Sequence, residues 1–74
     1  MSVRLVNRDY EPTDQDEQVL SVLGDGRANP LLLREETGLE KQRVNDSLQR
    51  LTSAGWVQKV TRGLYELVED PRNG

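Results

Sequence analysis

The order of apolar and polar positions along the chain predicts three helices followed by two strands. The first helix opens at Thr13, where Asp16 three residues later resembles a capping box, and it ends at the GDG of residues 24–26. Asn29 and Pro30 mark the start of the second helix, because Asn is a favoured N-cap and Pro suits the first helical position. The apolar positions of these two helices are Val19, Leu20 and Leu23 in the first and Leu31, Leu32 and Leu33 in the second.

A third helix is expected over residues 40–53, after Gly38 has ended the second helix at its C-cap position. Its apolar residues recur at positions i, i+4 and i+7, and this spacing predicts one buried face. These residues are Val44, Leu48 and Leu51.

The two strand-like segments, residues 56–60 and 64–68, flank a turn at residues 61–63 that contains glycine, and together they predict a hairpin. A two-stranded hairpin is only marginally stable alone in water, so it must pack against the helices. We therefore expect Val57, Tyr65 and Leu67 to point inward, Ala28 to contribute at most one residue of strand, and Trp56 to belong to the core.

These elements divide the chain into an N-terminal arm or short edge strand (1–12), an α+β domain (13–68) and a flexible C-terminal tail (69–74). The sequence leaves two interpretations of the arm open. In one, Tyr10 forms a dimer patch with three apolar residues of the arm; in the other, the arm is loosely packed. The three apolar residues are Val3, Leu5 and Val6.

Composition narrows the possible functions. The 74 residues include no cysteine and no histidine, which removes the commonest zinc ligands and the commonest general base, so we expect neither an enzyme nor a metal or other cofactor site. No apolar run approaches the roughly 20 residues of a membrane span, and the first residues lack the apolar core of a signal peptide, so we expect a cytoplasmic protein. A chain this short often dimerises to extend its core.

The charge is unevenly distributed. The net charge is −3, which is unusual for a protein that binds phosphates. Residues 9–38 contain eight acidic and two basic residues, whereas residues 39–63 contain five basic and two acidic ones. This asymmetry is consistent with one surface that attracts nucleic acid and one that repels it, and also with an ordinary solvated surface of mixed sign.

The segment EETGLEKQRVNDSL has the features of a helix-turn-helix, in which a short turn with glycine joins two helices and the second enters the major groove. With the apolar face inward, polar side chains cover the outer face, and Arg43 and Arg50 lie towards its flanks. Lys and Arg pair with guanine, and Asn and Gln pair with adenine. Any exposed helix face is polar, however, so this pattern alone does not establish DNA binding. The candidate base-reading residues are Lys41, Gln42, Arg43, Asn45 and Gln49.

The hairpin adds two candidate contacts. Arg62 at its turn would enter a minor groove or bind phosphate, and Lys59 would bind the backbone, because narrow minor grooves attract arginine. The alternative is that Arg62 is a solubilising charge on an exposed hairpin.

Three segments, ETGL at the turn, LQRLTSAGWVQKV from helix to strand, and TRGLYEL at the hairpin, resemble the winged helix-turn-helix domains of archaeal transcription regulators. The likeness is nearest to the small phage-repressor-like proteins of halophilic archaea, which lie near the broad MarR-like and ArsR-like winged-helix group. The resemblance covers residues 13–68 and implies three helices followed by a hairpin wing. It also implies a dimeric, sequence-specific regulator of transcription, in particular a repressor, bound to double-stranded DNA. The implied contacts are Lys41, Gln42, Arg43 and Asn45 on the recognition helix and Arg62 in the wing.

An acidic composition fits a protein from salt-loving cells. Counterion release contributes less to binding in high salt, so contacts to base edges and shape must contribute more. The alternative function is a winged-helix module that binds another protein rather than DNA. The two alternatives differ in the surface they require: DNA requires the basic side chains to converge on one face, whereas a protein partner is favoured if Glu40, Asp46 and Glu66 interrupt it.

Overall fold

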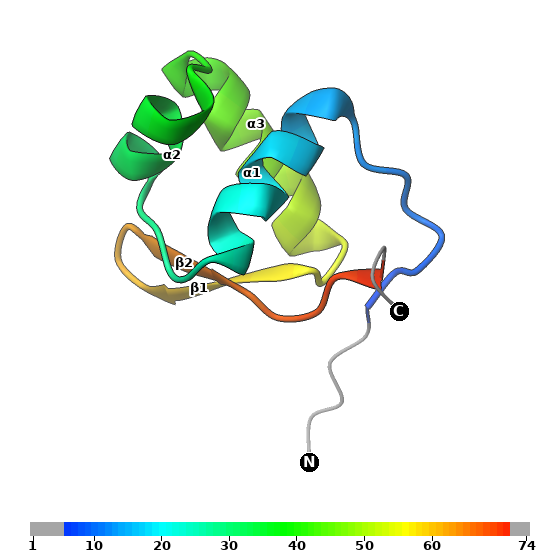
Figure 1. The fold of residues 1–74 in the computed structure, drawn as a ribbon. Helices are drawn as coiled ribbons and strands as arrows, with labels where there is room; N and C mark the ends of the chain where they lie inside the picture. The colour runs from blue at the N-terminus through cyan, green and yellow to red at the C-terminus, as the bar shows by residue number, and fades with distance from the viewer. Residues whose placement is uncertain (1–5, 72–74) are drawn as a thin grey trace.

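A computed structural model of the chain describes residues 6–71. Three helices lie against one face of a two-stranded antiparallel hairpin (Figure 1). The α+β class expected from the sequence is therefore confirmed. The elements in chain order are α1 (Asp14–Gly24), α2 (Pro30–Thr37), α3 (Lys41–Ser53), β1 (Val57–Thr61) and β2 (Leu64–Leu67).

The helix ends follow the capping signals of the sequence. The Thr13 hydroxyl accepts a hydrogen bond from the backbone N–H of Asp16 (3.1 Å), and the Asp16 carboxylate accepts one from the backbone N–H of Thr13 (3.1 Å), so the capping box is present. Asn29 caps α2 through its side chain. Gly38 ends α2 in the left-handed region, at φ 76°, which glycine adopts without steric cost. The sequence placed the start of the third helix at Glu40, which is instead its N-cap.

The hairpin differs slightly from the expected one. Each strand ends about one residue from its expected position, and the turn contains only Arg62 and Gly63 between the strands. A register shift between Lys59 and Thr61 marks an irregularity in β1. Ala28 forms an isolated bridge with Tyr65, so the single residue of strand expected after the first helix is present.

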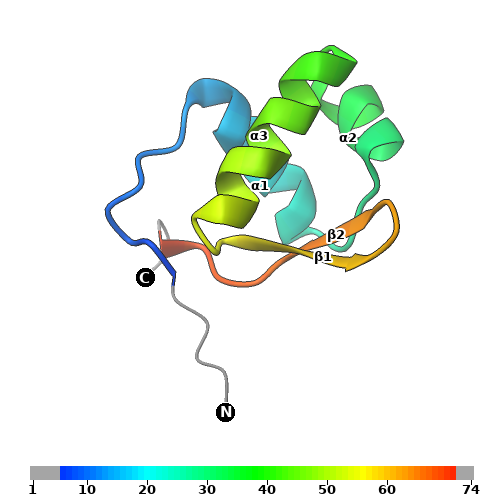
Figure 2. The same ribbon diagram turned by 180° about the vertical axis from the view of Figure 1, so that it is seen from behind.

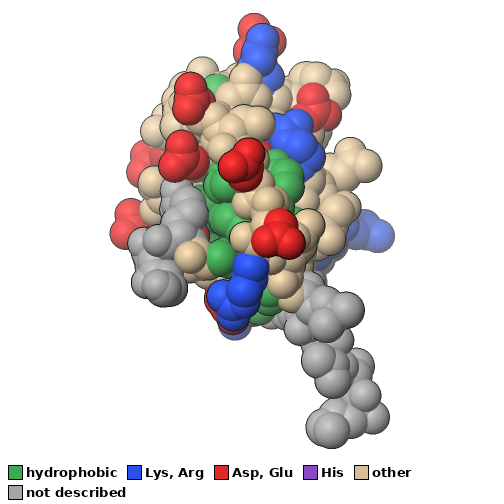
Figure 3. Space-filling view, turned by 90° about the vertical axis from the view of Figure 1, so that its right-hand side faces the viewer, with side chains coloured by type: hydrophobic (Ala, Val, Ile, Leu, Met, Phe, Trp, Pro, Cys, Tyr) green, Lys and Arg blue, Asp and Glu red, His purple; other side chains and the backbone are tan. Residues whose placement is uncertain are grey.

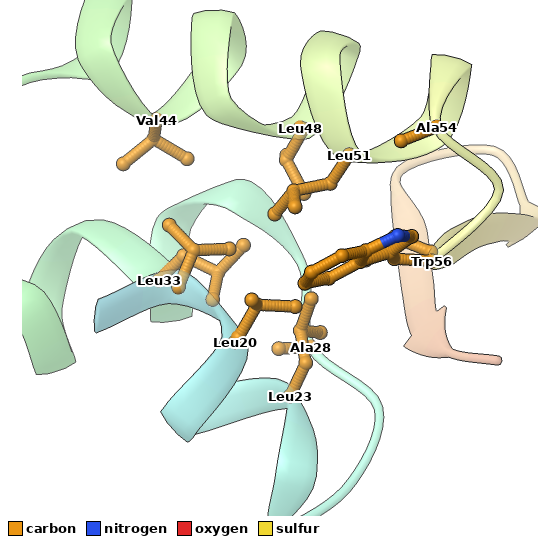
Figure 4. Close-up of a cluster of buried hydrophobic side chains, with 11 residues drawn as sticks. Leu20, Leu23, Ala28, Leu33, Val44, Leu48, Leu51, Ala54 and Trp56 are labelled. Atoms are coloured by element: carbon orange, nitrogen blue, oxygen red, sulfur yellow. The ribbon is translucent and has the colours of Figure 1, made fainter. Parts of the chain in front are cut away.

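Trp56 lies among the apolar side chains of the helices in the core (Figure 4). The helix faces expected to be buried are buried, and Val57 also lies inside, whereas Tyr65 and Leu67 are only partly buried. The fully or almost fully buried apolar residues are Val19, Leu20, Leu23, Ala28, Leu33, Val44, Leu48, Leu51, Ala54, Trp56 and Val57.

The three leucines of α2 do not share one environment. Leu33 is completely buried, whereas Leu31 is 58% exposed and Leu32 is 41% exposed. Three consecutive residues of a helix point in directions about 100° apart, so a short helix with one buried face cannot bury all of them. Of the three apolar positions that the sequence shows in α2, only Leu33 therefore belongs to the core.

Part of the N-terminal arm is packed against the helices. The backbone N–H of Asn7 donates to the carbonyl of Ala54 (2.8 Å), and the indole N–H of Trp56 donates to the carbonyl of Asn7 (2.8 Å). The ring of Tyr10 meets that of Trp56 edge to face, with centroids 5.7 Å apart. The loosely packed interpretation of the arm is therefore wrong at Asn7 and Tyr10.

Two further described residues of the ends, Val6 and Glu69, also contact the rest of the fold. Val6 packs at the edge of the core, while Val3 and Leu5 lie outside the described residues. At the other end, the Glu69 carboxylate forms an ion pair with Arg8, so the start of the expected tail contacts the arm. Within residues 6–71, no helix is both long enough and apolar enough to cross a membrane.

Candidate nucleic-acid interface

Helix α3 has one buried side and one exposed side. Its buried residues, Val44, Ser47, Leu48 and Leu51, follow helical spacing and pack towards α1, α2 and β1. This packing leaves the opposite side of the helix in solvent. All five candidate base-reading residues of the sequence are exposed there or on its flanks: Lys41, Gln42, Arg43, Asn45 and Gln49.

A groove of about 330 Å³ separates the exposed side of α3 from the hairpin. Asn45 and Gln49 line it from the helix, and Lys59 lines it from β1, so three of the seven predicted site residues meet at one place. In the view in which α3 faces the reader, the hairpin runs beside the helix from their shared end (Figure 2). Leu48 and Tyr65 give this groove apolar lining between its polar rims.

Lys41 extends this polar row towards the start of the helix. It precedes Asn45 by four residues and Gln49 by eight, and residues at this spacing lie one above another on the same helix face. The groove side of α3 therefore carries a lysine followed by two amide side chains, in the order Lys41, Asn45 and Gln49.

Arg43 belongs to the opposite flank. It precedes Arg50 by seven residues, which is close to two helical turns, and Arg50 is bound to Asp16 of α1. Arg43 therefore lies on the α1 side of the helix, away from Lys59. The structure does not bring it together with the residues of the groove.

The exposed face also carries an acid. The side-chain amide of Gln42 donates to the carboxylate of Asp46 (3.0 Å), so this candidate base-reading amide is engaged within the helix. Glu66 points elsewhere: it binds Arg27 (3.0 Å) and Gln58, and successive residues of a strand point to opposite faces of the hairpin. Asp46 therefore interrupts the polar face of α3, whereas Glu66 lies on the other side of the hairpin.

Arg62 lies at the tip of the hairpin. Its side chain is exposed, and it makes no hydrogen bond or ion pair with any other residue between 6 and 71. Gly63 beside it has φ 75°, which explains the glycine of the turn. Within the described part of the chain, the guanidinium of Arg62 therefore plays no part in holding the fold together.

The sequence did not reveal the buried charge cluster beneath α3. The carboxylate of Asp16 is completely buried and accepts hydrogen bonds from the hydroxyl of Tyr10 and from Arg50, whose Nη2 is 2.9 Å away. Arg50 Nη2 also donates to the hydroxyl of Ser47 (3.1 Å). The capping position of Asp16 was visible in the sequence, but its partner lies 34 residues away and has no local signal.

This cluster shifts the ionisation of its members. Burial by itself raises the pKa of Asp16, but hydrogen bonds from Arg50, Tyr10, Ser47 and the backbone of Thr13 outweigh it, so the pKa lies below the ordinary 3.8. Burial, followed by the hydrogen bond to the Asp16 carboxylate, raises the pKa of Tyr10 above 10.0. Asp16 is therefore charged at neutral pH, and it largely neutralises Arg50.

A second hollow, of about 370 Å³, lies on the other side of the exposed ridge of α3. Arg50 and Tyr10 line it together with Asn7 of the arm, and Gln49 and Ser53 line both this hollow and the groove beside the hairpin. On the side of the molecule that carries the arm, acidic and basic side chains are interspersed around exposed hydrophobic atoms (Figure 3). This side is therefore mixed in charge rather than uniformly acidic.

Comparison of the chain with protein-family models, with curated proteins and with solved structures gave no match.

Proposed function

We propose that this chain is a winged helix-turn-helix domain that binds double-stranded DNA and regulates transcription, with α3 as recognition helix and the hairpin as wing. The observation that carries the proposal is the groove in which Asn45 and Gln49 of α3 face Lys59 of β1. An α-helix with its side chains is about 10–12 Å across, and the major groove is about 12 Å wide, so a helix with one free polar side fits it.

The residue types along the groove side suit direct reading of bases. Asn45 and Gln49 can each pair bidentately with adenine, and Lys41 can donate to guanine. Arg43, on the opposite flank, is assigned to a backbone phosphate rather than to a base. Gln42 reads a base only after it leaves Asp46, so we assign it a minor role.

The hairpin supplies the second contact. Arg62 is the exposed tip residue of the wing and reaches a minor groove or a phosphate, while Lys59 binds the backbone beside the groove. Three cations then face phosphates, namely Arg43, Lys59 and Arg62, and they predict a salt slope of about −2.7 in log K against log salt. This is a weak dependence for a DNA-binding protein and agrees with an acidic chain that functions at high salt.

The test is selection of binding sites from random double-stranded DNA, followed by fluorescence anisotropy on the selected site. Asn45→Ala should reduce discrimination at one base pair by about 1–3 kcal/mol. Arg62→Ala should weaken binding to all sequences and reduce the salt slope by about 0.9.

Arg27→Ala is the charge-matched control, because Arg27 pairs with Glu66 on the face of the hairpin that points away from the groove. It should leave both sequence preference and affinity nearly unchanged. Absence of double-stranded DNA binding by the wild type, from low to multimolar potassium chloride, would refute the proposed function.

We also propose that the regulator binds as a homodimer, since a domain of this size gains core by association and two recognition helices read two half-sites. Sedimentation of the complex with a selected site measures its stoichiometry. One chain per site would contradict the dimer but not DNA binding.

One observation favours the alternative, a domain that binds another protein. Leu31 and Leu32 are exposed next to each other on α2, and Asp46 lies within the recognition face. A variant that carries both Leu31→Ser and Leu32→Ser distinguishes the two functions. It should still bind DNA if DNA is the ligand of α3.

A further inference from the structure

The two hollows described above border the same strip of α3. Gln49 and Ser53 line both of them, so these residues form the ridge between the groove beside the hairpin and the hollow beside the arm. Each hollow has one cationic side chain in its lining, Lys59 in the first and Arg50 in the second. The ridge of α3 is therefore flanked by Lys59 on one side and, on the other, by Arg50, whose charge is paired with that of Asp16.

Arg50 is held in place from behind. Its Nε and Nη2 atoms point at the Asp16 carboxylate, and Nη2 also reaches the hydroxyl of Ser47. Its side chain nevertheless remains 37% exposed. A guanidinium fixed by a carboxylate on one edge is pre-organised to donate from its other edge, with little loss of conformational entropy.

Other donors converge on the same hollow. Asn7, Gln49 and Ser53 line it with Arg50, next to Tyr10 and Ala54, and no Asp or Glu is among its lining residues. Hydroxyl, amide and guanidinium groups are the side chains that proteins use to contact phosphate oxygens. The chemistry that fits this hollow is a phosphate group.

We infer that the hollow formed by Asn7, Gln49, Arg50 and Ser53 binds a backbone phosphate of the DNA strand opposite to the one that the wing contacts. This inference rests on the proposed function. A helix in the major groove has a phosphate backbone along each of its sides, and the wing accounts for only one of them. The packed arm then becomes part of the DNA-binding surface, because Asn7 forms one wall of the site.

The test changes the charge at the rim of the hollow without touching the buried cluster. Arg50 itself is unsuitable, because its loss would leave Asp16 buried without its partner. Ser53 is exposed at the end of α3 and borders both hollows, so Ser53→Lys and Ser53→Glu change the charge on the ridge between them without removing a partner of the buried cluster. Ser21 provides the matched control, since it is an exposed serine on α1 outside both hollows.

Affinity for a selected DNA site is measured by anisotropy at the lowest salt at which circular dichroism shows all variants folded. Ser53→Glu should bind DNA about fivefold more weakly than Ser21→Glu, and Ser53→Lys about fivefold more tightly than Ser21→Lys. The reason is that a charge at position 53 lies close to the phosphate in the hollow, whereas a charge at position 21 does not. Ser53→Glu should also reduce the salt slope by about 0.9, which corresponds to one phosphate contact.

The outcomes distinguish this inference from the function on which it rests. Wild-type protein that fails to bind DNA overturns both. DNA binding in which the Ser53 and Ser21 pairs respond alike overturns the phosphate site alone. A titration with inorganic phosphate, followed by amide chemical shifts, separates the sources of phosphate. Saturable shifts at the hollow, combined with unchanged DNA affinity in the Ser53 variants, would assign it to a free phosphate ion and overturn the backbone assignment.

Discussion

Asp16→Asn is expected to destabilise the fold by about 2 kcal/mol. Removing one partner of a buried ion pair costs about 3–5 kcal/mol when the other charge remains buried. Here Arg50 is the remaining charge, and its side chain is 37% exposed, so water recovers part of the loss. Asparagine also retains one oxygen that can accept the hydrogen bond from the Thr13 backbone, which lowers the cost further.

The measurement is urea denaturation at pH 7, followed by the fluorescence of Trp56, the one tryptophan, and by far-ultraviolet circular dichroism. A domain of this size has a total stability of roughly 4–11 kcal/mol. With a slope near 1 kcal/mol per molar urea, the midpoint should fall by about 2 M. Asp14→Asn is the control, because Asp14 is an exposed acid in the same first turn and its loss removes only an interaction with the helix dipole, about 0.5 kcal/mol.

The reasoning fails if the two variants lose the same stability, since the burial and the partners of Asp16 would then contribute nothing beyond its position in the helix. Tyr10→Phe provides an independent check. It removes the hydroxyl that donates to Asp16 and should cost about 1 kcal/mol. A Tyr10→Phe change that is neutral in wild type would show that the arm does not stabilise the carboxylate.

Three further outcomes are expected in the same assay. The pKa of Asp16 is lower in the folded state, so the stability advantage of wild type over Asp16→Asn should be constant above about pH 5. The advantage should decrease as the pH falls below 3.8 and through the folded pKa. An advantage that grows at acid pH would contradict this. Leu33→Ala should cost about 2–5 kcal/mol because Leu33 is completely buried, whereas Leu31→Ala should change stability by less than about 0.5 kcal/mol, and equal losses would refute the assignment of the buried face of α2. Gly38→Ala should cost about 1 kcal/mol from backbone strain alone, because its φ is 76° and no atom lies within 4 Å of an added Cβ; a neutral effect would argue against the left-handed turn.

Local signals predicted most of the fold. The capping residues Thr13, Asn29 and Gly38 set the helix ends to within about a residue, because capping depends on hydrogen bonds between near neighbours in the chain. The buried face of α3 followed from spacing, since helical periodicity places every third or fourth residue on one side. The sequence could not tell which of Leu31, Leu32 and Leu33 is buried, because a run of identical apolar residues has no periodicity.

The candidate site was predicted in composition but not in arrangement. The sequence placed polar and basic residues on one helix and one hairpin. It could not tell that Asn45 and Gln49 face Lys59, or that these three residues line one groove. These facts depend on how the hairpin packs beside α3, which is set by burial of Trp56 and Val57 between elements distant in sequence.

By itself, then, the sequence determined the helices, the hairpin, the buried face of α3 and the exposed position of Arg62, because each of these depends on residues within a few positions of each other. Only the tertiary structure decided that the arm packs against Trp56 and that Asp16 binds Arg50 across 34 residues. It also decided that α3 has a hollow on each side. The reason is physical: a buried charge needs a partner from wherever the fold brings one, and the local sequence carries no record of that choice.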